Sequence, residues 1–250
     1  VIFGSKWSGS TNNEKSYAVW AGDGLTSAST NFQPTYSWNN QNILTYIKEF
    51  NKNHRINATL VFEQSHSNNM QQKVNVSDLY SVNIGHNNTG FSKKIISVPG
   101  ERKKISSMAA LARVNYVFMD RYMLTASWRY DGSSVLAFGN KWEQFPSLAL
   151  AWNVKQENFL QNVDFLSQLK LRVGYGQVGN SGVAAYSEYT EINPNFMPDG
   201  SVSFVVSRLG QPDLKWERTE QWNVGLDMGF FNNRLTATLD LYRKNTHEML

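Results

Sequence analysis

The sequence predicts an all-β chain whose antiparallel strands form part of the wall of a transmembrane β-barrel. Three observations support this fold class. The strands alternate apolar and polar residues, so that each has one apolar and one polar face. Several exceed the usual globular length of about five or six residues and match the roughly 9–11 residues of a tilted membrane strand. Very short turns alternate with long polar loops, as in outer-membrane barrels.

The hairpin nearest the C-terminus separates its apolar and polar residues most completely onto opposite faces. The segment Phe231-Asn232-Asn233-Arg234 can form a two-residue turn, because Asn tolerates the positive φ that such turns require. In that register every facing pair on one side is apolar: Phe230 with Leu235, Met228 with Ala237, Leu226 with Leu239 and Val224 with Leu241. The opposite face carries glycine, threonine and aspartate, so one side is apolar and the other is polar.

A second hairpin turns at Met119-Asp120-Arg121. The predicted register again places apolar pairs on one face: Phe118 with Tyr122, Tyr116 with Leu124, Val114 with Ala126 and Ala112 with Trp128. The other face is polar apart from Val117 and Met123 beside the turn. A slip of one residue would mix the two faces, so the pattern specifies the register.

A third turn at Asn51-Lys52-Asn53 pairs Leu44 with Leu60 and Tyr46 with Ala58. This hairpin is the least clean, because Lys48 falls on the apolar side and Ile47 on the polar side.

Period-two alternation predicts eight long strands, at 43–50, 54–64, 105–118, 122–131, 145–154, 168–177, 215–230 and 235–245. The segments 65–104, 132–144 and 178–214 are expected to be long extracellular loops, and the short turns to be periplasmic. Apolar residues at roughly helical spacing predict a short helix between Glu157 and Ser167. Residues 1–42 alternate poorly and are expected to be loop or irregular strand, whereas residues 43–250 form the barrel wall.

Composition excludes several classes of protein. The chain has 250 residues, of which 41% are hydrophobic and 18% charged, and this argues against wholesale disorder. No apolar run approaches the roughly 20 residues of a membrane helix. The absence of cysteine removes disulfides, thiol catalysis and cysteine-bound metals. A scattered net charge of +4 gives no basic stripe for nucleic acid.

Signals for catalysis, metals and cofactors are also lacking. His54, His66, His86 and His247 are scattered, with no pair at metal-ligand spacing. Glycines at positions 174, 176 and 179 are not followed by a convincing helix, so a phosphate-binding loop is not supported. No carboxylate pair or nucleophile lies in a recognisable catalytic frame. We therefore expect no catalytic residue, metal or cofactor.

The two ends of the chain carry no recognisable terminal signal. Val1-Ile2-Phe3 is followed at once by small and polar residues, unlike a signal peptide, and Leu250 comes directly after a strand. We expect the chain to be an internal piece of a longer protein.

A series of motifs resembles the SusC/RagA group of TonB-dependent outer-membrane transporters. Each motif is weak alone, but their number and order are specific, and they cover roughly residues 43–250. They are Arg113-Val-Asn115-Tyr116, Asp120-Arg121-Tyr122, Arg129-Tyr-Asp131-Gly132-Ser133-Ser134, Phe145-Pro146-Ser147, Trp152, Glu157-Asn-Phe159-Leu160, Leu169-Lys170-Leu171-Arg172, Tyr175-Gly176, Gly179-Asn180 and Pro212-Asp213-Leu214-Lys215-Trp216-Glu217.

That resemblance implies a barrel of about 22 strands, plugged by an N-terminal domain and energised from the inner membrane through TonB. It implies an outer-membrane location, import of glycans or peptides, and a SusD-like surface lipoprotein as partner. No plug domain and no TonB-contacting segment are recognisable in this chain, which would contribute wall and outer loops.

The candidate contact residues fall into two sets. Polar side chains on the lumen face could dock the plug or contact an anionic or hydroxylated ligand: Arg113, Asn115, Arg129, Asp131 and Arg172. The simpler alternative, which the generally polar interior of barrels favours, is a solvated wall. Loop aromatics could stack on sugar rings, pack against a lipoprotein or only pack the loops together: Trp142, Tyr186, Tyr189 and Phe196.

Aromatics near the turn-side strand ends are predicted to form an interfacial girdle at the membrane surface. They are Tyr116, Phe118, Tyr122, Trp152 and Phe230.

Two other hypotheses remain from the residues alone. A soluble β-rich carbohydrate-binding module would pack the apolar strand faces against a second sheet, and periodicity does not distinguish that arrangement from lipid. Strand length and the alternating connections argue against it. An outer-membrane enzyme is the third hypothesis, and no motif supports it.

Overall fold

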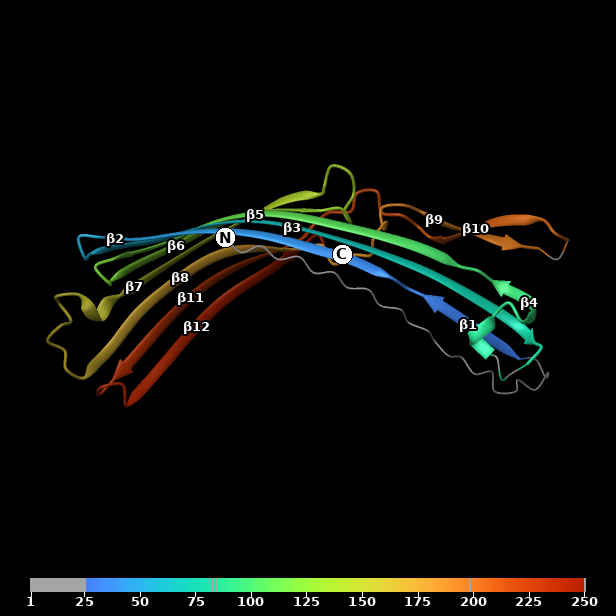
Figure 1. Ribbon diagram of the computed structural model, residues 1–250. Helices are drawn as coiled ribbons and strands as arrows, with labels where there is room; N and C mark the ends of the chain where they lie inside the picture. The colour runs from blue at the N-terminus through green and yellow to red at the C-terminus, as the bar shows by residue number, and fades with distance from the viewer. Residues whose placement is uncertain (1–25, 82, 84, 198, 250) are drawn as a thin grey trace. The chain divides into compact units, whose positions relative to one another are not determined.

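The computed structural model describes residues 26–81, 83, 85–197 and 199–249, apart from the side chains of His86 and Phe196. Within that part of the chain no helix has the length and apolar character needed to cross a membrane. The elements are labelled in Figure 1 and are β1 (Ser27–Phe32), β2 (Thr35–Phe50), β3 (His54–Leu79), η1 (Gly85–Asn88), β4 (Ser92–Ser97), β5 (Gly100–Phe118), β6 (Tyr122–Ser133), β7 (Trp142–Asn153), η2 (Val154–Gln156), β8 (Leu166–Asn180), β9 (Glu191–Phe196), β10 (Val202–Arg208), β11 (Glu217–Phe230) and β12 (Leu235–His247).

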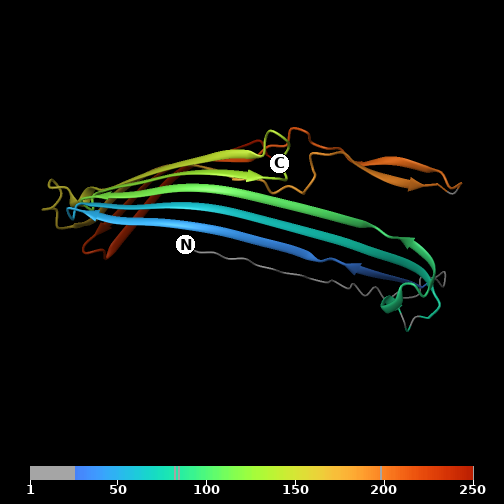
Figure 2. The same cartoon turned by 45° about the horizontal axis from the view of Figure 1, so that its top comes forward.

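The larger of two compact units comprises residues 40–64 and 107–249. Its main sheet has the strand order β3-β5-β6-β7-β8-β11-β12, with β2 paired to β3. All strand pairs from β5 to β12 whose registers are described are antiparallel. Figures 1 and 2 show β6, β7 and β8 running side by side. Among the described residues β12 pairs only with β11, so the sheet is open there, and closure into a barrel of about 22 strands stays an expectation from the resemblance.

The second unit is built from residues 26–39 and 65–106. In it β1 pairs with β3 from Ser27 opposite Ser77 to Phe32 opposite Gln72, and β4 pairs with the same part of β3. Ala28 and Val76 face each other and are both buried, which gives this unit a small core.

The two clean hairpin registers are confirmed. Leu226 faces Leu239 and Phe230 faces Leu235 in the C-terminal hairpin, and Phe118 faces Tyr122 in the β5–β6 hairpin. Phe231, Asn232 and Asn233 all have positive φ, so the turn uses the left-handed conformation that Asn tolerates. The predicted pairing of β2 with β3 is also present.

Several strands are longer than predicted. Residues 65–104 were expected to be a loop, whereas β3 runs to Leu79 and β5 begins at Gly100. The 178–214 segment likewise contains the β9–β10 hairpin. The extensions of β3 and β5 are mostly polar on both faces, because strand ends beyond a bilayer meet water on both sides. The alternation on which the prediction relied is therefore lost there.

Residues 1–42 were expected to be loop or irregular strand. Residues 27–32 and 35–42 instead lie in β1 and the first half of β2, and residues 1–25 are outside the described part.

The predicted helix between Glu157 and Ser167 is absent from the structure. Three successive turns take its place, because the N–H groups of Leu160, Val163 and Leu166 each donate to the carbonyl three residues earlier (3.0, 3.1 and 3.3 Å). The ammonium group of Lys155 also donates to the carbonyls of Leu160 and Val163, each at 2.9 Å. Those carbonyls are occupied by the lysine, which favours a capped turn over a helix.

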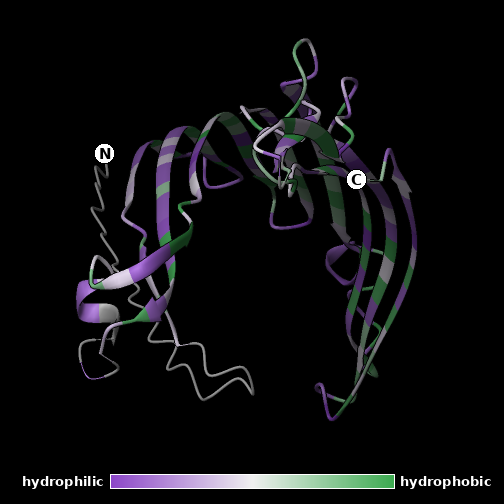
Figure 3. Cartoon of the chain, turned by 90° about the vertical axis from the view of Figure 1, so that its right-hand side faces the viewer, coloured by the Kyte–Doolittle hydropathy of each residue, from purple (hydrophilic) through white to green (hydrophobic). Residues whose placement is uncertain are grey.

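The sheet from β5 to β12 has one apolar and one polar face. Figure 3 shows hydrophobic and hydrophilic residues alternating along its strands. On the apolar face the predicted aromatics occupy the short-turn end, and a second aromatic group lies nearer the long loops. Its rings form two separate sets. Tyr130 adjoins Trp128 and Trp142, with centroids 5.8 and 5.0 Å apart, and Tyr175 adjoins Trp222 at 4.5 Å.

Aliphatic side chains separate the two aromatic groups. Tyr122 and Tyr130 are eight residues apart, about 27 Å along an extended strand, and a tilt of about 40° reduces this to about 20 Å. Leu124 and Ala126 lie between them on the same face. The spacing resembles the apolar band of about 25 Å between the two aromatic girdles of an outer-membrane barrel.

Candidate functional site

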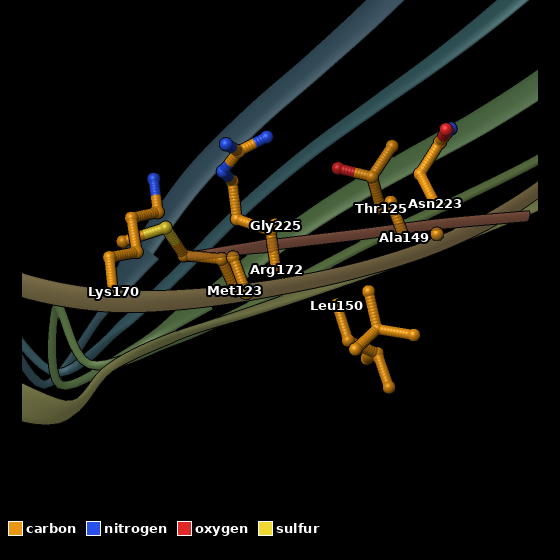
Figure 4. A pocket seen from close by; sticks show the side chains of 11 residues that line it. Met123, Thr125, Ala149, Leu150, Lys170, Arg172, Asn223 and Gly225 are labelled. Atoms are coloured by element: carbon orange, nitrogen blue, oxygen red, sulfur yellow. The ribbon is translucent and has the colours of Figure 1, made fainter. Parts of the chain in front are cut away.

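A recess on the polar face of the sheet is formed by small residues on neighbouring strands. It has a volume of about 380 Å³, and Ala149, Gly174 and Gly225 contribute to its lining. Figure 4 shows Arg172 and Thr125 on one side of the sheet, together with Lys170, Met123 and Asn223, while Leu150 lies on the other side. The recess therefore opens on the face predicted to line the lumen.

At one edge of this recess, the side chain of Arg172 on β8 reaches across to two further strands. Its guanidinium donates two hydrogen bonds to Asp227 on β11, each 2.9 Å long, and one of 2.9 Å to Asp240 on β12. The crossing requires a glycine at position 225, which pairs with both Arg172 and Asp240. A Cβ there would lie 2.5 Å from Oδ1 of Asp240 and 2.7 Å from Cζ of Arg172.

Arg129 forms a separate cluster with two carboxylates. Its Nε donates to both oxygens of Asp131, at 2.9 and 2.7 Å, and its Nη2 donates to Oε2 of Glu63 at 3.3 Å. Glu63 also accepts a hydrogen bond from the amide of Gln41. Side chains from β2, β3 and β6 thus meet on this part of the polar face.

The five predicted lumen residues do not form a single site. Arg172 is in register with Ala151, which is in register with Met123, only two positions from the β5–β6 turn. Arg129 instead pairs with Phe145, toward the long loops. The polar face therefore has a cluster near the short turns and another near the long loops.

The remaining two lumen residues lie on β5. Asn115 accepts a hydrogen bond of 2.9 Å from the Thr125 hydroxyl on β6. Arg113 is exposed and faces Ser127 across the same strand pair. Both belong to the polar face, as the alternation predicts.

A small hydrophobic core among the long loops was missed by the sequence reasoning. Its buried members come from three separate segments: Val135, Leu136, Ala137, Phe145, Ala185, Leu214 and Trp216. Trp216 packs edge-on against Phe145, with ring centroids 5.5 Å apart, and its indole N–H donates to the Lys141 carbonyl at 3.1 Å. Any Cβ at Gly179 would overlap the Phe145 ring. The family motifs contain four residues that form or border this core: Phe145, Gly179, Leu214 and Trp216. The motifs did not show that these residues pack together.

The predicted loop aromatics occupy different environments. Trp142 is not in a loop, because it opens β7 and stacks on Tyr130 at 5.0 Å, where Gly132 leaves room for its ring. It therefore belongs to the aromatic group of the apolar face.

Tyr186 and Tyr189 share one exposed turn, in which the Tyr189 N–H donates to the Tyr186 carbonyl at 3.1 Å. Arg208 supports the turn by donating to the same carbonyl at 3.3 Å. A hydrogen bond with Glu188 raises the pKa of the Tyr189 hydroxyl. Phe196 ends β9, and its side chain is outside the described part.

A carboxylate at the short-turn end holds two of the girdle aromatics. Oε1 of Glu157 accepts hydrogen bonds from the Tyr122 hydroxyl at 2.6 Å and the Trp152 indole at 3.0 Å. Oε2 accepts from Arg121 at 3.3 Å. The hydrogen bond from Tyr122 and then that from Trp152 lower the pKa of Glu157, and the positive charge of Arg121 acts in the same direction. Glu157 is a family motif residue, and this geometry supplies its structural role.

Within the described residues no group of three or more histidines and carboxylates is placed to hold a metal ion. The polar clusters are ion pairs between arginines and carboxylates, which suits polar contact on a wetted wall.

Comparison with known proteins agrees with this arrangement. Residues 3–250 match the family described as TonB dependent receptor-like, beta-barrel. TonB-dependent receptor P26 of Formosa agariphila is 32% identical over 257 residues, covering 98% of this chain and 25% of that protein. TonB-dependent receptor SusC of Bacteroides thetaiotaomicron is 42% identical over 145 residues, covering 55% of this chain and 14% of SusC.

The fold is also similar to a solved structure, that of the RagAB peptide transporter. The TM-score is 0.78 at 25% identity, over 90% of this chain and 25% of the RagAB chain. The chain thus spans about a quarter or less of the length of these relatives. The chain belongs to the TonB-dependent receptor β-barrel family as a SusC/RagA-like member, and it forms part of the wall of an outer-membrane β-barrel.

Proposed function

We propose that this wall belongs to a TonB-driven importer that takes up glycans or peptides together with a SusD-like surface lipoprotein. The observation that carries the proposal is a two-faced sheet of the SusC/RagA type, apolar toward lipid and bearing ion-paired clusters on the other face. We propose transport and not catalysis, because the family that the chain matches is one of receptors and transporters.

The two polar clusters would serve different contacts. Short turns of such barrels are periplasmic, so the Arg172–Asp227–Asp240 cluster lies at the end where a plug domain and TonB would act. The Arg129–Asp131–Glu63 cluster lies nearer the long loops, where cargo enters. We propose plug contact for the first cluster and cargo contact for the second.

Cargo with hydroxyl or amide groups fits the second cluster. It holds one guanidinium and two carboxylates, so it can both donate to and accept from a sugar hydroxyl or a peptide group. The similarity to the RagAB peptide transporter favours peptides, and glycans are the other cargo class that the family resemblance implies. Asn115 and Arg113 extend the same polar face for cargo or plug.

The lipoprotein would engage the long-loop end. The β9–β10 hairpin projects beyond the ends of β8 and β11 (Figures 1 and 2). It exposes large apolar side chains, of which Phe204 is 73% exposed. The Tyr186–Tyr189 turn adjoins it through Arg208. The loop core would hold the hairpin and the Tyr186–Tyr189 turn in one orientation. Their side chains could then contact a partner or stack on sugar rings.

Uptake by the full-length receptor in its native host tests the main proposal. Cells lacking the receptor should fail to take up a labelled oligosaccharide or a labelled oligopeptide from pools of each class, and the wild-type gene should restore uptake. Restoration should require an intact TonB system. Unchanged uptake of every pool in the deletion strain would overturn the import proposal.

Paired variants separate the two clusters. Arg129→Gln should weaken binding of the transported cargo to the purified receptor, because it removes a charged donor from the cargo path. Arg172→Gln should leave cargo binding unchanged and reduce energised uptake, because it alters the plug side. The reverse assignment of these two defects would refute the division of roles.

Co-purification tests the partner. A SusD-like lipoprotein should be recovered with the tagged wild-type receptor, and Phe204→Asp should reduce its recovery by placing a charge on the hairpin surface. Leu241→Phe, on the membrane face, serves as a control. Equal recovery with Phe204→Asp and the control would exclude this hairpin from the interface.

A further inference from the structure

A large recess also lies on the apolar face, at the short-turn end of β5, β6, β7 and β8. Its volume of about 710 Å³ is nearly double that of the polar recess and falls within the roughly 300–1,000 Å³ typical of ligand sites. Three aromatic rings form one wall, and aliphatic side chains form the floor. The wall consists of Phe118, Tyr122 and Trp152, and the floor of Leu124, Leu150 and Leu171.

The register explains why a recess forms at this place. Phe118, Tyr122, Trp152 and Leu171 lie side by side on successive strands. The rings are nearly parallel, because Phe118 and Tyr122 are inclined by 23° and Tyr122 and Trp152 by 12°. The neighbouring row has Tyr116 on β5 and the smaller Leu124 and Leu150 on β6 and β7, so Tyr122 and Trp152 stand beside a low aliphatic surface.

The aromatic wall is fixed in place by the short-turn segment. Glu157 binds the hydroxyl of Tyr122 and the indole N–H of Trp152 through one oxygen, and Arg121 through the other. Charge-assisted hydrogen bonds of this kind hold both rings in one orientation. The same row continues as Leu171, Leu226 and Leu239 on β8, β11 and β12, where no ring forms a wall. The recess is thus a local feature of the membrane-facing surface.

Charges of both signs border the recess at the short-turn end. Arg121 is paired with Glu157, the carboxylate that also binds the two rings Tyr122 and Trp152 of the aromatic wall. Adjacent guanidinium and carboxylate groups complement a headgroup that carries a phosphate and an ammonium group.

We propose that this recess binds one zwitterionic phospholipid from the leaflet at the short-turn side. The first part of an acyl chain lies over the aliphatic floor against the aromatic wall. The phosphate meets Arg121, and the headgroup ammonium meets Glu157. The recess is continuous with the surface that faces the bilayer, so a lipid reaches it without leaving the membrane. The proposal rests on the outer-membrane location and is independent of the transported cargo.

Native mass spectrometry of the full-length receptor tests this proposal. Receptor in mild detergent is given 1-palmitoyl-2-oleoyl phosphatidylethanolamine or the anionic phosphatidylglycerol with the same chains, and stepwise delipidation follows. The wild-type receptor should retain one phosphatidylethanolamine about tenfold more strongly than phosphatidylglycerol, corresponding to about 1.4 kcal/mol. Equal retention of the two lipids would overturn the proposal.

Variants locate the bound lipid. Leu150→Trp fills the recess from its floor and should abolish the preferential retention of phosphatidylethanolamine, whereas the matched Leu239→Trp on β12 should leave it intact. Glu157→Gln, which lies outside the strands, should weaken retention by freeing the two rings. Each variant is first checked for the heat-modifiable gel mobility of a folded barrel. Retention that is the same in Leu150→Trp and Leu239→Trp, or unaffected by Glu157→Gln, would count against this site. Cargo uptake is not the readout, so failure here is distinguishable from failure of the import proposal.

Discussion

The loop core and the strand wall use the same apolar residues in opposite ways. Leu136 in the loop core is fully buried, whereas Leu241 in the middle of β12 is 65% exposed. The loop core excludes water by packing residues from three segments together. The wall leaves its largest apolar side chains on the surface, because the bilayer replaces the second layer that a soluble sheet requires.

The difference teaches that hydrophobic pattern alone does not reveal what covers a face. In the wall the hydrophobic pattern is regular, with period two, and the apolar residues of each strand face lipid. In the loops the apolar residues are few and irregularly spaced, yet they form a core of buried side chains. Substitutions that distinguish burial in protein from contact with lipid test this contrast directly.

The largest effect is expected in the loop core. Trp216→Ala should cost roughly 3–5 kcal/mol of local stability, because it opens a cavity beside Phe145 and removes the hydrogen bond to the Lys141 carbonyl. Hydrogen exchange should rise in residues 133–141 and 183–216 of the full-length receptor while the strand amides stay protected. The matched control is Leu209→Ala, 77% exposed, which should change little.

The membrane face should show a comparable effect with a different cause. Leu226→Arg should cost roughly 2–4 kcal/mol, because it places a charge near the middle of the bilayer. Thr238→Arg, on the polar face of the adjacent strand, should be tolerated. Denaturant unfolding of the full-length receptor in lipid vesicles measures both. Similar losses at the two positions would contradict the assignment of faces.

The ion pair on the polar face should contribute much less. Arg172 is 37% and Asp227 21% exposed, so solvent screens their attraction. A double-mutant cycle with Arg172→Gln and Asp227→Asn should give a coupling energy of about 1 kcal/mol in the same unfolding assay. A coupling of several kcal/mol would mean that this face is dry, and that the polar wall behaves like the loop core.

Sequence reasoning was most successful where one physical rule governed the residues. The two hairpin registers follow from Asn232–Asn233 and Met119–Arg121, because turn length and a single apolar face determine the pairing. The strand extensions toward Leu79 and Gly100 were missed because both of their faces are polar. The loop core escaped notice because its contacts join residues far apart in the sequence, such as Leu136 and Leu214.

The polar clusters were predictable only in part. Alternation placed Arg129 and Arg172 on the lumen face, but it did not identify their partners. Asp240 reaches Arg172 across the intervening strand β11, which depends on the side-chain space left by Gly225. Such a contact requires knowledge of two registers at once, whereas the short turn specified only that of β11 with β12.

The smallest effect is expected where Glu157, in the segment between β7 and β8, binds the rings of Tyr122 and Trp152. The pKa of Glu157 is lowered from its ordinary value near 4.5 by the hydrogen bonds from Tyr122 and Trp152. Its ionised form therefore stabilises the folded state above the unfolded-state pKa, and this contribution is lost as the pH falls through the lower folded-state pKa. Hydrogen exchange at residues 154–165 should increase over that acidic range, and Glu157→Gln should remove the pH-dependent increase. If the variant kept the same pH profile, another group would control the segment, and the girdle would be held by lipid contact alone, as the rest of the wall is.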